Sequence, residues 1–190
     1  STKPMRDFTK GELEWEPWIT PVDLDEATPE QREALKITPS SRAVGVYSLV
    51  LAHDPESVKE RSPLYNAVMF GPKGLPRADR ELGAVVASRI NGCAYCAAVH
   101  AKRFVELAKE PEVMERLHRD GLAAKLDPRR SAMVAYAARL TVAPAAIGPA
   151  DAAPLRAQGL SDGDILDLTN AVAMFAWANR LMQSLGKSAP

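Results

Sequence analysis

The placement of proline is the feature that most limits what this 190-residue chain can fold into. Many of its fifteen prolines stand where a helix can start, a position that tolerates proline because a first-turn N–H has no helical partner. Thr28-Pro29 is followed by Gln31, which completes a capping box. Apolar residues between such signals recur at helical spacing, and strand-like alternation is scarce, which predicts an all-α fold. Further start signals of this kind are Asp54-Pro55, Pro76, Pro111 and Asp127-Pro128.

The same pattern predicts the individual helices and a division of the chain. Residues 142–160, rich in Ala, Pro and Gly, are expected to form either a surface excursion or a short extra helix. Residues 1–26, with Trp15 and Trp18, are expected to form an extended arm before a helical domain at 27–190. The tryptophans indicate that the arm docks, either on its own core or on a neighbouring subunit. Helices are expected near 29–36, 41–52, 55–70, 76–90, 93–109, 111–120, 128–141 and 162–185.

The composition excludes several classes of protein. Lys and Arg together number 24, as do Asp and Glu, so the chain lacks the basic excess of a general nucleic-acid binder. No apolar run approaches the roughly 20 residues that a membrane helix needs. The first residues, Ser1 to Pro4, lack the apolar stretch of a signal peptide. A soluble cytoplasmic protein that binds neither nucleic acid nor membrane is therefore expected.

Both cysteines of the chain lie in one short segment, which points to chemistry rather than to a structural staple. Cys93 and Cys96 would close only a tiny loop if joined, and such a bond would stabilise the fold little. Asn91-Gly92 predicts a helix stop, so Cys93 stands at or near the start of the next helix. Free amide groups there stabilise a thiolate, which by itself favours Cys93 as the more acidic thiol. His100 follows at helical spacing on the same face.

A carboxylate is expected close to these residues. Glu81 precedes the helix stop by about ten residues, or roughly 15 Å of helix, and His100 follows it by roughly 12 Å. If the two helices fold back on each other, Glu81 lies nearer the level of His100 than that of Cys93. The carboxylate can then orient the imidazole, which can exchange a proton with a cysteine.

Three other interpretations of a Cys-x-x-Cys pair fit less well. Zinc needs three or four ligands, and the chain has no second pair, while His53 and His118 fall in unrelated segments. A c-type haem needs a histidine directly after the second cysteine, where Ala97 stands. A structural role for two small buried thiols remains open. His53 is expected at a helix end and His118 on a solvated face.

The segment resembles a known family signature. Its spacing is Glu, eleven residues, Cys-x-x-Cys, three residues and His, carried here by Glu81, Cys93, Cys96 and His100. This spacing resembles the motif of the alkylhydroperoxidase D-like (AhpD-like), carboxymuconolactone decarboxylase superfamily. The resemblance covers about residues 40–185, and the closing segment 170–182 is similar to the last helix of the peroxidase-related branch.

The resemblance implies an oligomeric AhpD-like helical bundle that reduces hydroperoxides with thiols. It implies that Cys96 attacks the peroxide, Cys93 resolves the product, and Glu81 and His100 relay protons. It further implies no bound cofactor, no metal, and an external thiol or dithiol reductant, delivered directly or through an adaptor protein. Superfamily decarboxylases typically lack the cysteine pair, so lactone decarboxylation is not expected. Tyr95 replaces a histidine of the best-known members, and it can either donate a hydrogen bond to a thiolate or simply pack.

Two alternatives to a peroxidase stay open. The same pair could serve a thiol–disulfide oxidoreductase or redox sensor, or it could be vestigial in a non-enzymatic helical oligomer. Many short apolar helices expose more apolar surface than one small domain can cover, so a homo-oligomer, at least a dimer, is expected. The resemblance implies a trimer or a hexamer as further expected states. Phe175 and Trp177 on the last helix are expected in the core or at a subunit interface rather than in a substrate pocket.

Overall fold

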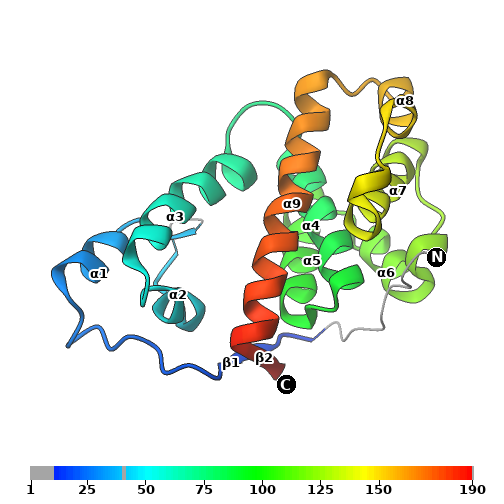
Figure 1. Cartoon of the computed structure of the whole chain (residues 1–190). Helices are drawn as coiled ribbons and strands as arrows, with labels where there is room; N and C mark the ends of the chain where they lie inside the picture. Colours follow the sequence, from blue (N-terminus) through cyan, green and yellow to red (C-terminus); the bar gives the residue numbers. More distant parts are fainter. Residues whose placement is uncertain (1–10, 40–41, 190) are drawn as a thin grey trace.

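The computed structural model describes residues 11–39 and 42–189, which form a helical bundle with one small two-stranded ribbon (Figure 1). The predicted all-α class is confirmed. In chain order the elements are β1 (Glu14–Pro17), α1 (Pro29–Ala34), α2 (Val46–Leu51), α3 (Pro55–Phe70), α4 (Arg77–Asn91), α5 (Ala94–Ala108), α6 (Pro111–Asp120), η2 (Gly121–Ala123), α7 (Pro128–Val142), η3 (Pro144–Ala146), α8 (Pro149–Ala157), α9 (Asp162–Leu185) and β2 (Gly186–Ala189).

Side-chain caps form three of the predicted helix starts, whereas the starts at Pro76 and Pro111 have none. The Thr28 hydroxyl accepts from the Gln31 amide while the Gln31 side chain accepts from the Thr28 amide, which is the expected capping box. The carboxylates of Asp54 and Asp127 cap α3 and α7 by accepting from the Ser57 and Arg130 amides, and each cap is followed directly by a proline. These contacts satisfy amide donors that the helix itself leaves open.

One helix differs from the sequence prediction, and one open alternative is decided. The helix expected at 41–52 is shorter, because the chain is extended at Gly45 and α2 begins only at Val46. Residues 40–41 lie outside the described residues. The connection at 142–160 contains a short extra helix, α8, so the second of the two alternatives holds. Asp151 explains this helix, since its carboxylate accepts from the Gly148 amide at 2.8 Å and caps the first turn.

The helix α4 occupies the centre of the bundle. It packs against α5, α7 and α9, which surround it in Figure 1. Every residue from Asp79 to Ile90 is buried, charged ones included. A charge in such a position needs a partner, and Asp79 has one in Arg129 at 2.7 Å. The charged residues of α4 are therefore held by specific contacts rather than by solvent.

The described part of the N-terminal arm docks on its own chain. β1 pairs antiparallel with β2, with Trp15 opposite Ser188, at the lower end of α9 in Figure 1. The indole N–H of Trp15 donates to the Met182 carbonyl at 2.9 Å, and the ring is buried. Gly186 permits this approach, because a Cβ there would overlap the Trp15 ring. Residues 1–10 of the predicted arm lie outside the described residues, and the division at residue 26 stays a prediction.

Among the helices that the structure describes, none combines the length and the apolar character that spanning a membrane would require.

The ribbon predicts a large difference between the two arm tryptophans. Trp15→Ala removes a ring that is only 8% exposed, so we expect it to lower the free energy of unfolding by about 3–5 kcal/mol. Trp18 is 63% exposed, and Trp18→Ala is expected to change that free energy by no more than about 0.5 kcal/mol. Urea unfolding of both variants tests this, and equal losses would contradict the docking of Trp15.

Candidate active site

The turn between α4 and α5 places the two cysteines. Gly92 adopts a left-handed conformation (φ 86°) that ends α4, and the Cys93 amide donates to the Ser88 carbonyl at 2.9 Å. Cys93 is the N-cap residue of α5, and Cys96 lies in its first turn. The predicted helix stop and helix start are both confirmed. Both sulfurs consequently lie at the positive end of a helix, where a thiolate is favoured.

Cys93 and Cys96 form a disulfide in this structure, with their Cα atoms 5.4 Å apart. Only 2% of Cys93 and 3% of Cys96 is exposed. They belong to a cluster of buried residues, here called the cysteine cluster, that comes from four elements. The Met182 sulfur lies 3.4 Å from the Cys96 sulfur. The cysteine cluster consists of Trp15, Val50, Cys93, Cys96 and Met182, with Tyr47, Tyr95 and Leu185 packed against it.

A buried carboxylate–imidazole contact crosses from α4 to α5. One carboxylate oxygen of Glu81 lies within hydrogen-bond distance of His100 Nδ1, and Glu81 is fully buried while His100 is 4% exposed. The other carboxylate oxygen, Oε1, has no hydrogen-bond partner among the described residues. The expected proximity of Glu81 to His100 is thus present. Since a carboxylate in an apolar interior is costly unless it is paired, this contact also fixes how α4 and α5 align.

Aromatic rings continue from His100 towards α3. The imidazole packs edge-to-face on Phe175, with centroids 4.1 Å apart, and Phe175 contacts the Tyr65 ring at 5.9 Å. Phe175 is therefore part of the core, as expected, and it limits the positions open to the imidazole. Trp177 is 43% exposed and takes no part in these contacts.

The Tyr95 ring packs against the cysteine cluster, which agrees with the packing alternative. Its backbone amide donates to the Ser188 hydroxyl at 2.9 Å and ties the first turn of α5 to β2. Tyr95 therefore links the cysteine turn to the ribbon through its main chain.

Polar residues that the sequence analysis passed over hold the end of α4. Asn179 of α9 is fully buried; its amide donates to the Ser88 hydroxyl at 3.0 Å and accepts from the Asn91 amide at 3.1 Å. The Gln183 amide donates to the Asn91 carbonyl at 2.9 Å. The sequence does contain a signal for Asn179, since it is a polar residue at a core position of the apolar stripe that includes Phe175 and Met182.

The other two histidines lie apart from this site. His53 is exposed just beyond α2, where its Nε2 contacts the Thr20 carbonyl at 2.7 Å. His118 is half-buried on α6, and its carbonyl accepts from Arg89. Neither joins the cysteines, and among the described residues no group of three or more His, Cys, Asp or Glu side chains is arranged to hold a metal ion.

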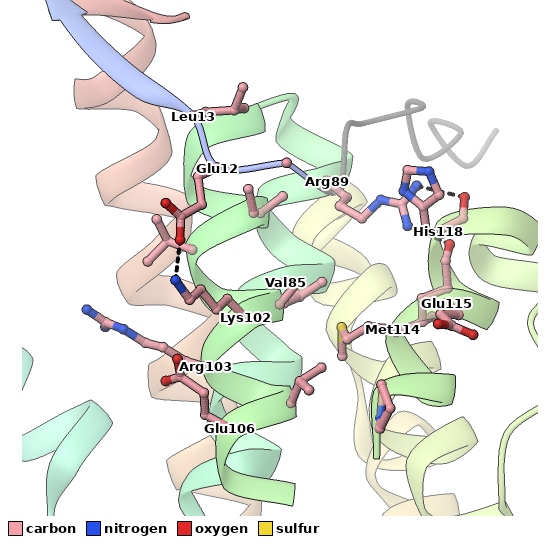
Figure 2. A pocket seen from close by; sticks show the side chains of 18 of the residues that line it. Glu12, Leu13, Val85, Arg89, Lys102, Arg103, Glu106, Met114, Glu115 and His118 are labelled. Atoms are coloured by element: carbon pink, nitrogen blue, oxygen red, sulfur yellow. Dashed lines mark hydrogen bonds and ion pairs between the residues drawn. The ribbon is translucent and has the colours of Figure 1, made fainter. Parts of the chain in front are cut away.

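A pocket of about 730 Å³ lies on another face of α5, between α4 and α6 (Figure 2). Its floor is apolar, and an ion pair between Glu12 and Lys102 closes one side. None of the four motif residues lines it, although Ala97 and Val99, their neighbours in the sequence, do. We therefore assign the chemistry to the buried cysteine cluster and not to this larger pocket.

This fold and this pair of cysteines define a class of protein. The sequence profile of the carboxymuconolactone decarboxylase family matches residues 55–139, which include all four motif residues. A solved structure of an uncharacterised peroxidase-related protein from Silicibacter sp. TM1040 is 32% identical, covers 87% of this chain and 89% of its own, and has a TM-score of 0.72. The chain belongs to the AhpD-like, carboxymuconolactone decarboxylase superfamily, and the predicted resemblance is confirmed.

Two further solved structures extend the comparison. A peroxidase-related protein from Ralstonia eutropha JMP134, described as an alkylhydroperoxidase AhpD core, is 26% identical, covers 89% of this chain and 90% of its own, and has a TM-score of 0.77. The debrominase Bmp8 shares the fold at 15% identity, with a TM-score of 0.72 over 89% of this chain and 90% of its own. No functionally curated protein matches the chain. The fold thus accommodates more than one chemistry.

Two tyrosines beside the site are buried deeply enough to change how they titrate. Burial raises the pKa of Tyr47 from 10.0 to about 12, and burial likewise raises the pKa of Tyr65 to about 12. The Tyr47 hydroxyl has no hydrogen-bond partner among the described residues, and the Tyr65 hydroxyl accepts from Arg103 at 3.4 Å.

These raised pKa values predict a loss of stability at alkaline pH. Between about pH 10 and 12 the folded chain keeps protons on Tyr47 and Tyr65 that the unfolded chain releases. The free energy of unfolding is unaffected below that window and declines through it, by up to about 1.4 kcal/mol per pH unit for each tyrosine. Urea unfolding at pH 9, 10 and 11 measures the decline. The Tyr47→Phe/Tyr65→Phe double variant should lose most of it, and an unchanged slope in that variant would contradict the assignment.

Proposed function

We propose that this protein is a thiol-dependent peroxidase that reduces organic hydroperoxides through Cys93 and Cys96. The observation that carries the proposal is a disulfide-forming Cys-x-x-Cys pair at the start of α5, together with a buried contact between Glu81 of α4 and His100 of α5. The relatives described as peroxidase-related support the same chemistry.

In the first half of the cycle, the Cys96 thiolate attacks the outer oxygen of the hydroperoxide. The S–O bond forms as the O–O bond breaks, so that Cys96 becomes a sulfenic acid and the substrate leaves as an alkoxide. The alkoxide takes a proton from the relay of His100 and Glu81 and departs as the alcohol. Glu81 contributes by holding the imidazole through Nδ1 and stabilising its charged form.

In the second half, the Cys93 thiolate attacks the Cys96 sulfur. The new S–S bond displaces hydroxide, which leaves as water after protonation, and the product is the disulfide seen in this structure. An external dithiol then supplies two electrons and two protons through a mixed disulfide. Both sulfurs are buried, so the residues that cover them must open locally before a reductant can attack.

The same proposal includes the reactants and the oligomeric state. It requires no bound cofactor or metal, only a hydroperoxide and a thiol or dithiol donor, reached directly or through an adaptor protein in the cytoplasm. We also propose that the chain forms a homo-oligomer, a dimer, trimer or hexamer. Exposed apolar side chains on two helices support this: Leu64 on α3, and Leu166 and Trp177 on α9. The particle mass from light scattering tests it.

The two cysteines should fail at different steps. Cys96→Ser is expected to abolish hydroperoxide consumption, because no sulfur remains to attack the O–O bond. Cys93→Ser is expected to leave Cys96 as a trappable sulfenic acid, because nothing displaces its hydroxyl. Dimedone labelling and mass spectrometry after one equivalent of peroxide locate the adduct. A sulfenic acid on Cys93 in Cys96→Ser, with none on Cys96 in the converse variant, would exchange the two roles.

The same experiment distinguishes the alternatives. A wild-type disulfide that cycles with dithiols but is not formed by hydroperoxide would make the protein a thiol–disulfide oxidoreductase or redox sensor. A pair that does not cycle at all would make it a non-enzymatic helical protein.

Glu81→Gln should change the reactivity of the reduced pair while the fold is kept, because the amide oxygen can still accept a hydrogen bond from His100. We expect Glu81→Gln to lower the rate of peroxide reduction by roughly 100-fold, the usual contribution of a positioned acid–base group, and to shift the pH–rate profile. Iodoacetamide alkylation of the reduced protein between pH 5 and 9 measures the change. Glu106→Gln, an exposed carboxylate on α5, is the matched control. Equal alkylation rates in both variants and the wild type would exclude a relay through Glu81.

A further inference from the structure

A buried arginine next to the candidate site has no anionic partner in the part of the chain that the structure describes. Arg61 of α3 is only 7% exposed, and no carboxylate among the described residues forms an ion pair with it. Its Nη2 makes one long hydrogen bond, 3.5 Å, to the Ser48 hydroxyl, and its Nε has no hydrogen-bond partner within residues 11–39 and 42–189. Burial accordingly lowers the pKa of Arg61 from its usual value. A guanidinium carries five donors, so most of its capacity is unused here.

A polar group beside Arg61 is also incompletely paired. Its guanidinium lies over the Tyr47 ring, 5.9 Å from the centroid, and the buried Tyr47 hydroxyl lacks a partner among the described residues. Buried polar groups are nearly always satisfied in native proteins, so the unused donors of Arg61 beside the unsatisfied Tyr47 hydroxyl indicate a ligand.

These groups lie next to the cysteine cluster and are connected by aromatic contacts to His100. Tyr47 packs against the cysteine cluster and meets Trp15 edge-to-face, with centroids 5.5 Å apart. Tyr65, one helical turn after Arg61 on α3, contacts Phe175, which in turn contacts His100. The Tyr47 ring thus lies between Arg61 and the cysteine cluster, and the Tyr65 and Phe175 rings lie between Arg61 and the imidazole. A molecule reacting at Cys96 could place a second functional group near Arg61.

Electrostatics decides which group that is. An isolated cation in a low-dielectric interior is unfavourable, and an anion with hydrogen-bond acceptors removes most of that penalty. A carboxylate suits a guanidinium best, because its two oxygens match the donor fork, and a phenol can donate one further hydrogen bond. A neutral ligand would leave the charge uncompensated.

We propose that Arg61 and Tyr47 bind the carboxylate of the substrate, which makes the preferred substrate an organic hydroperoxide that also carries a carboxylate. The hydrocarbon part of such a molecule would lie against the aromatic side chains between Arg61 and Cys96. The choice of substrate rests on the proposed peroxidase function, whereas the binding of a carboxylate at Arg61 does not depend on it.

A pair of substrates that differ only in charge tests the proposal. A medium-chain hydroperoxy carboxylic acid and its methyl ester react through the same O–O bond, but only the acid offers an anion. We expect Arg61→Gln to raise the ratio of KM for the acid to KM for the ester by about 10- to 100-fold, the range for a lost charge-assisted hydrogen bond. Arg61→Lys should restore part of the preference, and Tyr47→Phe should raise the ratio by a smaller factor. Lys59→Gln, which removes an exposed charge from the same helix, should leave the ratio unchanged.

Binding of unreactive octanoate, followed by calorimetry, separates this proposal from the proposed function. If neither hydroperoxide is reduced but octanoate binds wild type more tightly than Arg61→Gln, the peroxidase function fails and the carboxylate site stands. A second outcome is that both hydroperoxides are reduced, while Arg61→Gln and Tyr47→Phe change neither the ratio of the two KM values nor the affinity for octanoate. The carboxylate site is then refuted and the peroxidase function stands. Dissociation of an oligomer in Arg61→Gln, without loss of octanoate binding, would assign the guanidinium to a subunit contact and also overturn the proposal.

Discussion

The contact between Glu81 and His100 is the interaction on which the arrangement of this site depends. A carboxylate with no solvent exposure is tolerated only beside a group that can share or balance its charge, and His100 is the partner that the next helix supplies. Because α4 is buried along nearly its whole length, it cannot slide or rotate to expose Glu81. The contact therefore fixes the alignment of α4 with α5, and with it the position of the cysteines relative to the imidazole.

Segments near the two ends of the chain cover the cysteine pair. Trp15 on β1 and Met182 near the end of α9 both pack against the disulfide, although they stand at opposite ends of the sequence. The main-chain hydrogen bonds of the ribbon and the Tyr95–Ser188 contact hold these segments over the first turn of α5. The cysteine pair is thus protected from solvent by residues whose own hydrogen bonds are satisfied locally.

Two faces of α5 must be distinguished. The 730 Å³ pocket borders the face of Ala97 and Ala101, and an ion pair between Glu12 and Lys102 closes one side of it. The cysteines lie in a buried cluster outside that pocket. Size alone would favour the pocket as the site of chemistry. The chemical character of the residues favours the cysteine cluster, because its helix α5 also carries the imidazole of the Glu81–His100 contact, and Arg61 lies over the Tyr47 ring that packs against the cluster. The similarity of the fold to a debrominase shows that the superfamily scaffold alone does not select the reaction.

The sequence by itself determined the helices, the break at Gly92 and the approach of Glu81 to His100, because caps, proline positions and helical rise are local properties that need no knowledge of distant contacts. Only the tertiary structure decided that Trp15 covers the disulfide, that Met182 lies against Cys96, and that Asn179 holds the end of α4. It also decided that Arg61 is buried with no carboxylate paired to it among the described residues, whereas the sequence around Arg61 would equally suit an exposed position on α3. These facts follow from contacts between residues far apart in the chain, and periodicity shows which face of a helix is buried without showing what is packed against it.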